Sequence, residues 1–372
     1  MFKIKAVHIY TDVKFIDEDI NKFEGNYIHN TVVLLENNQK YSGEHSKEIL
    51  LLKENNENIK KIIEICNKAD IVFLYNLDLV KTYIANRITK KTKIAWRFFG
   101  DELYNRKQDL FLSDLTQKII FSKKLDFLKS TKEKIKIFLK WKINPEIEFF
   151  KAINRVNYFL CYFESEYELL KKDFKKFPEF IKFPLDQKHK VNNFCKLKKD
   201  KVIVVGNSKN KWNNHLDIIK IIKKTDNKDY KFYLLFSYGP ETQYTKKIRE
   251  EIYNFPAFVL IEDFYLKNDF DIFYSKVSSF VMNSYRQHAL GNIFVSIKNG
   301  VKIYLNKKNL VFNELIKDFK IFTIEDFEKD LKNNNLQLDE NDVIKNQKQL
   351  NKLLEECSIE KFQENIYSRI KK

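Results

Sequence analysis

Short apolar runs alternate along the chain with longer segments in which apolar residues recur every three or four positions. Runs of four to eight apolar residues are typical of strands buried on both faces, and the longer spacing is typical of amphipathic helices. The alternation predicts strand–helix–strand units and parallel sheets, and therefore an α/β fold. In the first half it predicts strands over 4–10, 31–35, 71–75, 94–99 and 158–163, and helices over 46–68 and 79–88.

The second half continues the same alternation after a polar, lysine-rich stretch at 186–200. It predicts strands over 202–205, 232–236, 258–261, 279–282 and 302–305, and helices over 215–224, 245–253, 271–276 and 292–299. We expect two Rossmann-like, doubly wound domains, 1–185 and 201–330, joined by the linker 186–200. A helical tail, 331–372, would pack back on the first domain. The carboxyl ends of both sheets would meet at one central cleft, where open α/β sheets bind ligands.

Composition narrows the class of protein. The 372 residues include 68 basic and 51 acidic side chains, a net charge of +17, which favours an anionic partner such as a membrane, a nucleic acid or a phosphorylated ligand. The 44% hydrophobic content excludes a disordered chain. No stretch has the roughly 18 apolar residues of a membrane span. Four cysteines far apart in the sequence indicate free thiols in a reducing compartment, and we expect a cytoplasmic protein.

One segment, 118–142, interrupts the alternation. It carries nine lysines and two acidic residues, a net charge of +7, with apolar residues between them and Trp141 near its end. Such a basic amphipathic helix is the pattern of a segment that lies in an anionic membrane interface. The alternative is a solvated helix whose apolar stripe packs on the first domain.

The strongest local motif begins at the predicted strand 202–205. This strand runs into Gly206-Asn207-Ser208, and a helix follows from Asn214-His215. A strand that turns into a helix in this way directs backbone N–H groups and the helix dipole at one point, which suits an anion such as a nucleotide diphosphate. Neither the Walker A nor the GxGxxG pattern is present. The alternative is an ordinary strand–helix turn capped by Ser208 or Asn213.

A second motif lies between the predicted strand 279–282 and the helix 292–299. Arg286 is one of only seven arginines, and an arginine at a strand end can hold a phosphate with two hydrogen bonds. Gln287 follows it, His288 offers a hydrogen bond to a phosphate or a sugar hydroxyl, and Gly291-Asn292 would open a second helix N-terminus. Taken alone, His288 is equally well read as a surface histidine.

Two further clusters carry candidate chemistry. Asp101 and Glu102 follow a first-domain strand and Gly100, so one carboxylate is a candidate general base, although Asp101 is also a candidate helix cap. Tyr238 and Gly239 follow the strand 232–236 and would line a base or sugar pocket, or form only a tight turn. The six histidines are scattered, with no pair at metal-ligand spacing, so we expect no metal and no other cofactor.

These motifs, in this order, resemble glycosyltransferase family 56, which includes the fucosaminyl (Fuc4NAc) transferase of enterobacterial common antigen, often labelled a 4-alpha-L-fucosyltransferase. The likeness lies mostly in 202–306. The resemblance implies a GT-B fold and a nucleotide-sugar donor held without metal by the second domain. It places Gly206, Asn207, Ser208, Asn214 and His215 in the first donor motif, Tyr238 and Gly239 in the second, and Arg286, Gln287 and Gly291 in the third.

In the first half only Trp96 and residues 100–104 resemble the family, and Glu102 stands in place of its aspartate. Ala289-Leu290 and Asp101 depart from the family's pattern. The resemblance also implies a peripheral enzyme at the inner face of the cell membrane that acts on a lipid-linked saccharide. We expect no nucleic acid partner.

We therefore expect a metal-independent glycosyltransferase of surface-polysaccharide (O-antigen or common-antigen) assembly that uses a dTDP-linked deoxy or acetamido sugar. The alternatives are a nucleotide-sugar epimerase or hydrolase of the same fold, and a non-enzymatic basic protein that binds membrane or nucleic acid.

Overall fold

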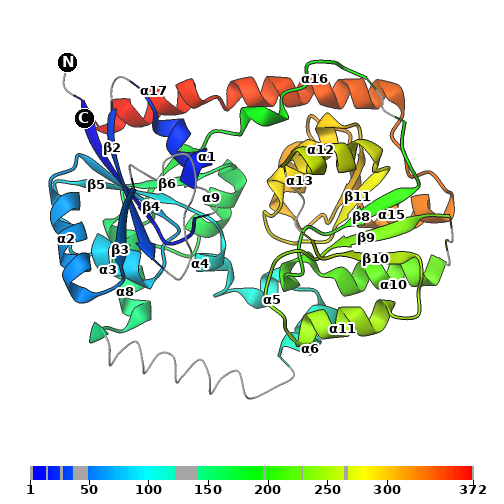
Figure 1. Ribbon diagram of the computed structural model, residues 1–372, viewed down its shortest axis with the longest axis horizontal. Helices are drawn as coiled ribbons and strands as arrows, with labels where there is room; N and C mark the ends of the chain where they lie inside the picture. The colour runs from blue at the N-terminus through cyan, green and yellow to red at the C-terminus, as the bar shows by residue number, and fades with distance from the viewer. Residues whose placement is uncertain are drawn as a thin grey trace. The chain divides into compact units, whose positions relative to one another are not determined.

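The computed structural model describes residues 3–13, 16–25, 28–36, 49–121, 141–195, 198–225, 227, 229–263 and 267–370. The chain divides into two compact units, and each contains one parallel sheet flanked by helices (Figure 1). Unit 1 comprises Met1–Asn105, Leu125–Leu185 and Cys357–Lys372. Unit 2 comprises Arg106–Lys124 and Asp186–Glu356. The predicted α/β class with two Rossmann-like sheets is confirmed.

The sheet of unit 1 has seven strands in the order β3-β2-β1-β4-β5-β6-β7, all parallel. Every residue of the central strand β4 is buried, as expected where helices cover both faces of a sheet. The strands are β1 (Ile4–Tyr10), β2 (Ile28–Glu36), β3 (Ile49–Lys53), β4 (Ile71–Tyr75), β5 (Lys93–Arg97), β6 (Tyr158–Cys161) and β7 (Glu179–Lys182).

The helices of unit 1 begin at polar caps where the sequence supplies them. Asn55 caps α2, Asp78 caps α3 and Asn144 caps α8, each by accepting a hydrogen bond from a backbone N–H of the first turn. The helices are α1 (Ile16–Ile20), α2 (Asn56–Asn67), α3 (Leu79–Ala85), α4 (Asp101–Tyr104), α8 (Pro145–Arg155), α9 (Glu164–Lys171) and α17 (Ile359–Ile370), with a 3₁₀ turn η1 (Asn21–Phe23).

The last helix, α17, belongs to the core of unit 1 although it lies at the end of the sequence. Phe362 and Ile366 are buried in the same apolar cluster as Ile4, Ala6 and residues of β4 to β7. Phe362 contacts the rings of Phe23 and Phe183. After the long second segment of unit 2 ends at Glu356, the chain therefore returns to unit 1 for its last 16 residues.

The sheet of unit 2 has six parallel strands in the order β10-β9-β8-β11-β12-β13. They are β8 (Val202–Val205), β9 (Lys231–Leu235), β10 (Phe258–Ile261), β11 (Ser279–Met282), β12 (Lys302–Leu305) and β13 (Phe322–Thr323). The helices are α5 (Gln108–Phe111), α6 (Asp114–Ile120), α10 (His215–Thr225), α11 (Gln243–Ile252), α12 (Lys267–Lys276), α13 (Leu290–Lys298), α14 (Leu310–Leu315), α15 (Ile324–Lys332) and α16 (Glu340–Glu356), with 3₁₀ turns η2 (Gln187–His189) and η3 (Lys211–Asn213).

Helices α5 and α6 lie within the range 1–185 of the predicted first domain, but they pack in unit 2. Leu115, Ile119 and Ile120 of α6 contact the apolar cluster formed by β8, β9, α10 and α11. Lys118 of the predicted basic segment 118–142 lies in α6, and the part from 122 to 140 lies outside the described residues.

The prediction of a helix over 46–68 is wrong for the first part of that range. Within the described residues, 49–53 form strand β3 and only Asn56–Asn67 are helical. The run Ile49-Leu50-Leu51-Leu52 is apolar at both helical and strand spacing, so periodicity does not decide between them. Residues 49–53 pair in parallel with β2, in register from Val32↔Ile49 to Glu36↔Lys53. This pairing makes the segment a strand. The short strands β7 and β13 were not predicted.

Candidate functional site

The strand order of unit 2 reverses between β8 and β11, which are neighbours in the sheet. Successive strands from β8 add on one side, through β9 and β10, and from β11 on the other, through β12 and β13. In open parallel sheets, ligands bind beyond the carboxyl ends of the strands at such a switch point. The predicted motifs at Gly206-Asn207-Ser208 and at Arg286 follow these two strands directly.

Gly206 adopts a left-handed backbone conformation with φ of +68°. A Cβ built on it would lie 2.4 Å from Nε2 of His215, so the imidazole occupies the space that a side chain would need. His215 is fully buried, and its Nδ1 lies 3.2 Å from the Tyr244 hydroxyl, which also accepts the His215 backbone N–H at 2.7 Å. Burial lowers the pKa of His215 to about 3, so the ring is neutral.

The loop after β8 is joined to the loop after β9 by hydrogen bonds. Asn207 Nδ2 donates to the Tyr238 hydroxyl, and the backbone N–H of Lys209 donates to the Tyr238 carbonyl at 3.1 Å. Gly239 has φ of +113°, and a Cβ there would lie 3.1 Å from Cγ of Lys209.

The loop after β8 is also closed on itself, because Asn213 Oδ1 accepts the Asn207 N–H and Asn213 Nδ2 donates to the Ser208 carbonyl at 3.0 Å. The predicted residues Asn207, Ser208, Tyr238 and Gly239 therefore form one compact group.

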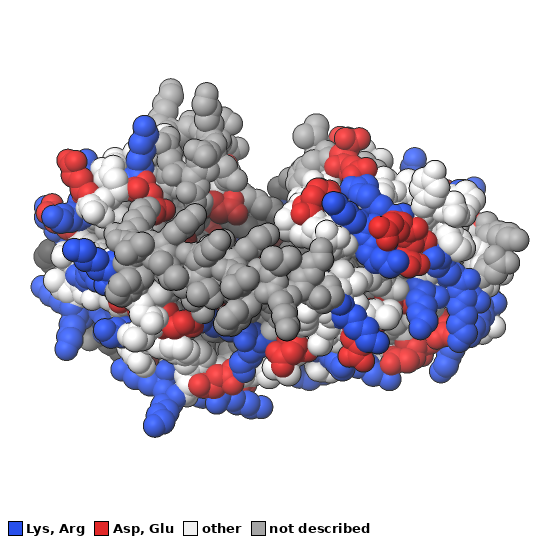
Figure 2. Space-filling model, turned by 90° about the horizontal axis from the view of Figure 1, so that it is seen from below, with Lys and Arg blue, Asp and Glu red and all other residues white. Residues whose placement is uncertain are grey.

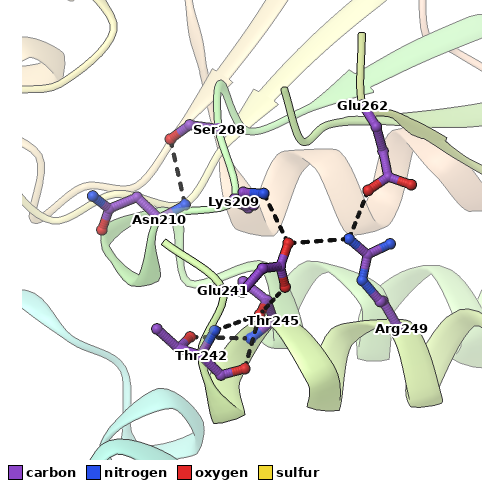
Figure 3. A network of polar contacts seen from close by, with 8 residues as sticks. All are labelled: Ser208, Lys209, Asn210, Glu241, Thr242, Thr245, Arg249 and Glu262. Carbon is purple, nitrogen blue, oxygen red and sulfur yellow. Dashed lines mark hydrogen bonds and ion pairs between the residues drawn. The ribbon is translucent and has the colours of Figure 1, made fainter. Parts of the chain in front are cut away.

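An ion-pair network extends from these two loops to Glu262, which directly follows β10 (Figure 3). Glu241 accepts from Lys209 Nζ at 2.7 Å and from the Thr245 hydroxyl at 2.9 Å, and it lies 3.3 Å from Arg249. Arg249 also pairs with Glu262 at 2.6 Å. The hydrogen bonds from Lys209 and Thr245 lower the pKa of Glu241 to about 2. The network fixes Lys209, and with it the loop that begins at Gly206.

Arg286 lies in the loop after β11 and is 4% exposed. Its guanidinium carbon lies 5.3 Å from the centre of the Trp212 ring, in the loop after β8, and its Nε donates to the Gln287 carbonyl at 3.3 Å. Ser284 supports this loop by donating to the Arg286 carbonyl. The structure thus brings Arg286 to the loop that carries the first predicted motif, and His288 lies half-buried two residues farther along.

Helix α13 begins within this site. Its N-cap residue, Ala289, has a left-handed φ of +56° and no side-chain cap for the first turn. A Cβ built on Gly291 would have no atom within 4 Å, so the space beside the first turn is open. Asn292 donates to the buried Tyr274 hydroxyl at 2.9 Å. An uncapped helix N-terminus beside open space, next to a buried arginine, is suited to an anion.

Asn214 is engaged within the fold of unit 2. Its Oδ1 accepts the Ser113 N–H at 2.9 Å, and its Nδ2 donates to the carbonyls of Phe111 and Asn283. Ser113 also donates from its hydroxyl to Asp217, whose pKa is raised by burial. Asn214 therefore connects the segment 106–121 to the two loops of the site. Sequence reasoning missed this role, and it missed Trp212 and Tyr274, because only the tertiary structure places them there.

The other predicted carboxylates, Asp101 and Glu102, lie in unit 1 on the short helix α4. Asp101 is exposed, whereas Glu102 Oε1 accepts from Trp96 Nε1 at 3.0 Å and from the Phe99 N–H at 3.2 Å. Helix α4 begins at Asp101 after Gly100 and has no side-chain cap, so the capping role that was considered for Asp101 is wrong. Burial raises the pKa of Glu102, which brings this carboxyl group nearer to the range of a general base.

The described residues contain no group of three or more His, Cys, Asp or Glu side chains arranged to hold a metal ion. Within the same residues, no helix is both long and apolar enough to cross a membrane. On the face shown in Figure 2, acidic side chains lie among the basic ones over the described atoms.

No family model matches the chain, and no curated protein matches its sequence. Solved structures match over nearly its whole length. HepE from Anabaena, in complex with UDP and glucose, aligns with a TM-score of 0.67 and 8% identity over 99% of each chain. The lipopolysaccharide outer core galactosyltransferase WaaB aligns with a TM-score of 0.59 and 12% identity, covering 98% of this chain and 100% of WaaB.

An alpha-glucosyltransferase in complex with UDP-glucose and DNA has a TM-score of 0.59 and 12% identity over 100% of this chain and 99% of its own. The chain therefore has the GT-B fold, as the sequence predicted.

Proposed function

We propose that this protein is a glycosyltransferase that uses a nucleotide-sugar donor bound by unit 2. One observation carries the proposal. At the switch point between β8 and β11, the buried Arg286 supplies positive charge and the uncapped start of α13 supplies N–H groups, next to the compact loop at Gly206. The similarity of the fold to HepE and WaaB adds support.

In this reaction the diphosphate leaves with developing negative charge. Arg286 and the N–H groups at the start of α13 stabilise that charge electrostatically, which is the task that a divalent cation performs elsewhere. Binding therefore needs no metal. Glu102 removes the proton from the acceptor hydroxyl, and Asp101 is the second candidate for this role.

The donor of the proposed reaction is a dTDP-linked deoxy or acetamido sugar, and the acceptor is a lipid-linked or surface-polysaccharide chain. The motif order that resembles glycosyltransferase family 56 supports both. The protein would work as a peripheral protein at the inner face of the cell membrane. Two exposed apolar residues of α8, Ile147 and Phe150, support this location, since they lie three positions apart and face solvent at 55% and 46%.

The test is calorimetric binding of dTDP, UDP, GDP and CMP to the full chain, each with and without Mg²⁺. The proposal requires one nucleoside diphosphate to bind in preference to the others, with the same affinity when Mg²⁺ is absent. Absence of binding to all four would refute the donor site. Product analysis with the preferred donor alone separates the alternatives, because an epimerase or hydrolase turns over without an acceptor.

A further inference from the structure

Strand β10 forms one edge of the sheet of unit 2. Among the described strands only β9 pairs with it, in register from Phe258↔Phe232 to Ile261↔Leu235. Folded proteins blunt a sheet edge by making its strand very short, by placing charges on it or by covering it. The opposite edge, β13, has only two residues. The four residues of β10 are all apolar and uncharged, so its outer side is suited to pairing with another strand.

The backbone of β10 offers hydrogen bonds on that outer side. The carbonyls of Ala257 and Ile261 accept from the N–H groups of Phe232 and Phe236, toward β9. Along a parallel strand, alternate residues direct both of their backbone groups to the same neighbour. Leu260 is out of phase with Ala257 and Ile261, so its N–H and C=O point away from β9. They are a donor and an acceptor that a further strand can satisfy.

The side chains around β10 are apolar and partly exposed. Every residue of β10 is half-buried, whereas every residue of β11 in the middle of the sheet is buried. Two aromatic residues precede the strand, Tyr253 at 86% exposure and Phe255 at 40%. The Phe255 carbonyl accepts the Phe258 N–H at 3.0 Å, which fixes Phe255 beside the amino end of the strand. Exposed aromatic residues beside an apolar edge indicate an interface with a protein.

The two ends of β10 carry opposite charges. At the amino end, Lys231 Nζ donates to the Pro256 carbonyl at 3.0 Å. At the carboxyl end Glu262 pairs with Arg249, and the next residue, Asp263, is exposed. Within the part of the chain that the structure describes, neither Lys231 nor Asp263 forms an ion pair. One ammonium and one carboxylate therefore remain available, at opposite ends of the same edge.

This polarity selects the partner. A peptide of one charge would match one end of the edge and be repelled by the other. Two identical strands that pair antiparallel about a two-fold axis bring the amino end of each against the carboxyl end of the other. With the axis at Leu260, the two Leu260 residues exchange both of their hydrogen bonds. Asp263 of each copy then lies opposite Ala257 of the other, beside Lys231, so the edge is complementary to itself.

We propose that β10 pairs antiparallel with β10 of a second copy of this chain, with Lys231 and Asp263 as the ion pair that sets the register. The six-stranded sheet of unit 2 then continues into that of the second copy. This interface follows the side edge of the sheet, whereas the proposed donor site lies beyond the carboxyl ends of β8 and β11. The dimer therefore does not depend on the proposed function.

The test is sedimentation equilibrium of the full chain over a wide range of concentrations. The wild type should form a reversible dimer that weakens as salt is added, because the ion pairs are exposed. Lys231→Glu and Asp263→Lys each place like charges opposite one another, and each should raise the dissociation constant about tenfold or more. Lys348→Glu, at an exposed lysine of α16, is the matched control and should dimerise as the wild type does.

An equal mixture of Lys231→Glu and Asp263→Lys should recover the dimer. In the mixed dimer the new carboxylate at 231 faces the new ammonium at 263, and the unchanged Lys231 faces the unchanged Asp263. A loss of dimer through misfolding would not be recovered by mixing, and urea unfolding shows that each variant is folded. A wild type that stays monomeric at every concentration, or a mixture that stays as weak as its components, would overturn the interface.

Hydrogen exchange shows whether the dimer forms along β10. The peptide 255–263, which contains the Leu260 N–H, should exchange more slowly at a concentration where the dimer dominates than at one where the monomer does. A peptide covering β13, the opposite edge, should exchange equally at both. A dimer whose formation leaves the exchange of 255–263 unchanged would place the interface elsewhere and refute the pairing.

Discussion

The imidazole of His215 lies where a side chain on Gly206 would have to be, with Nε2 only 2.4 Å from the ideal Cβ position. The glycine at the end of β8 is therefore required by a neighbour inside the fold as well as by its φ of +68°. The two residues are held together from both sides, because Tyr244 fixes His215 and the Val281 carbonyl accepts the Gly206 N–H at 2.9 Å.

Gly206→Ala should destabilise unit 2. The left-handed backbone costs an alanine about 1–2 kcal/mol, and the contact with His215 adds overpacking of about 1–3 kcal/mol. Urea unfolding measures the loss. Gly291→Ala is the control, because a Cβ there meets nothing within 4 Å and the residue lies in helix α13. That variant should be as stable as the wild type or more so, and equal losses in the two variants would contradict the assignment.

His215 makes the stability of the protein depend on pH. Its pKa is about 3 in the folded chain and 6.5 in the unfolded one, so the unfolded state binds more protons between these values. The free energy of unfolding therefore falls as the pH drops below 6.5, by up to about 1.4 kcal/mol per pH unit.

His215→Gln removes this contribution, while His8 and His189, whose pKa values burial lowers to about 4, remain in both proteins. Urea unfolding at pH 7, 6 and 5 should show a smaller slope for the variant. The same slope in both proteins would mean that His215 is not held neutral.

Arg286→Ala should weaken binding of the preferred nucleoside diphosphate at least tenfold, because a charge-assisted hydrogen bond contributes about 1.5–3 kcal/mol. Arg286→Lys should recover only part of the affinity, since an ammonium does not offer the planar pair of donors. Calorimetry with the same nucleotide panel gives both values. Exposed Arg106, in the same unit, supplies the control Arg106→Ala, which should leave the affinity unchanged.

Glu102→Gln should reduce sugar transfer by about 100-fold or more and leave nucleotide binding intact, because a general base contributes about that factor. Glutamine keeps the acceptor oxygen for Trp96 and Phe99. In the wild type, kcat should fall as the pH drops through the pKa of Glu102, which burial raises above the usual value of a glutamate. Asp101→Asn, on the exposed neighbour, should be nearly silent, and the opposite pattern would make Asp101 the base.

The exposed face of α8 should contribute to membrane binding. Replacing both Ile147 and Phe150 with serine removes apolar groups that would enter the interface, at about 0.8 kcal/mol for each buried methylene. Co-sedimentation with phosphatidylglycerol vesicles should fall several-fold. Phosphatidylcholine vesicles should bind neither protein well. Ile272→Ser, at a residue 60% exposed on α12, is the control. Equal co-sedimentation of the double variant and the wild type would remove α8 from the docking surface.

The residues of the candidate site were predictable from the sequence where they directly follow a predicted strand. Gly206, Asn207, Arg286 and Gly291 follow β8 and β11 in the sequence, and parallel strands bring their carboxyl ends to one edge. The resemblance to glycosyltransferase family 56 placed Asn214 in a donor-binding motif, yet its side chain holds the segment that contains Phe111 and Ser113. That partner is about 100 residues away in the chain, and no local pattern reports it.

The sequence by itself determined the parallel α/β class, ten of the strands in the described residues to within about three residues at each end, and the glycines that follow some of them, because hydrophobic period and backbone freedom are local properties. Only the tertiary structure decided that 49–53 pairs with β2 as a strand, that α6 packs in unit 2 and that α17 completes the core of unit 1. The hydrogen bonds that join Thr11 to Asp78 and Lys81 likewise span about 70 positions of the chain. Such choices depend on which surface is available to bury an apolar face or satisfy a charge, and that surface exists only once the rest of the chain has folded.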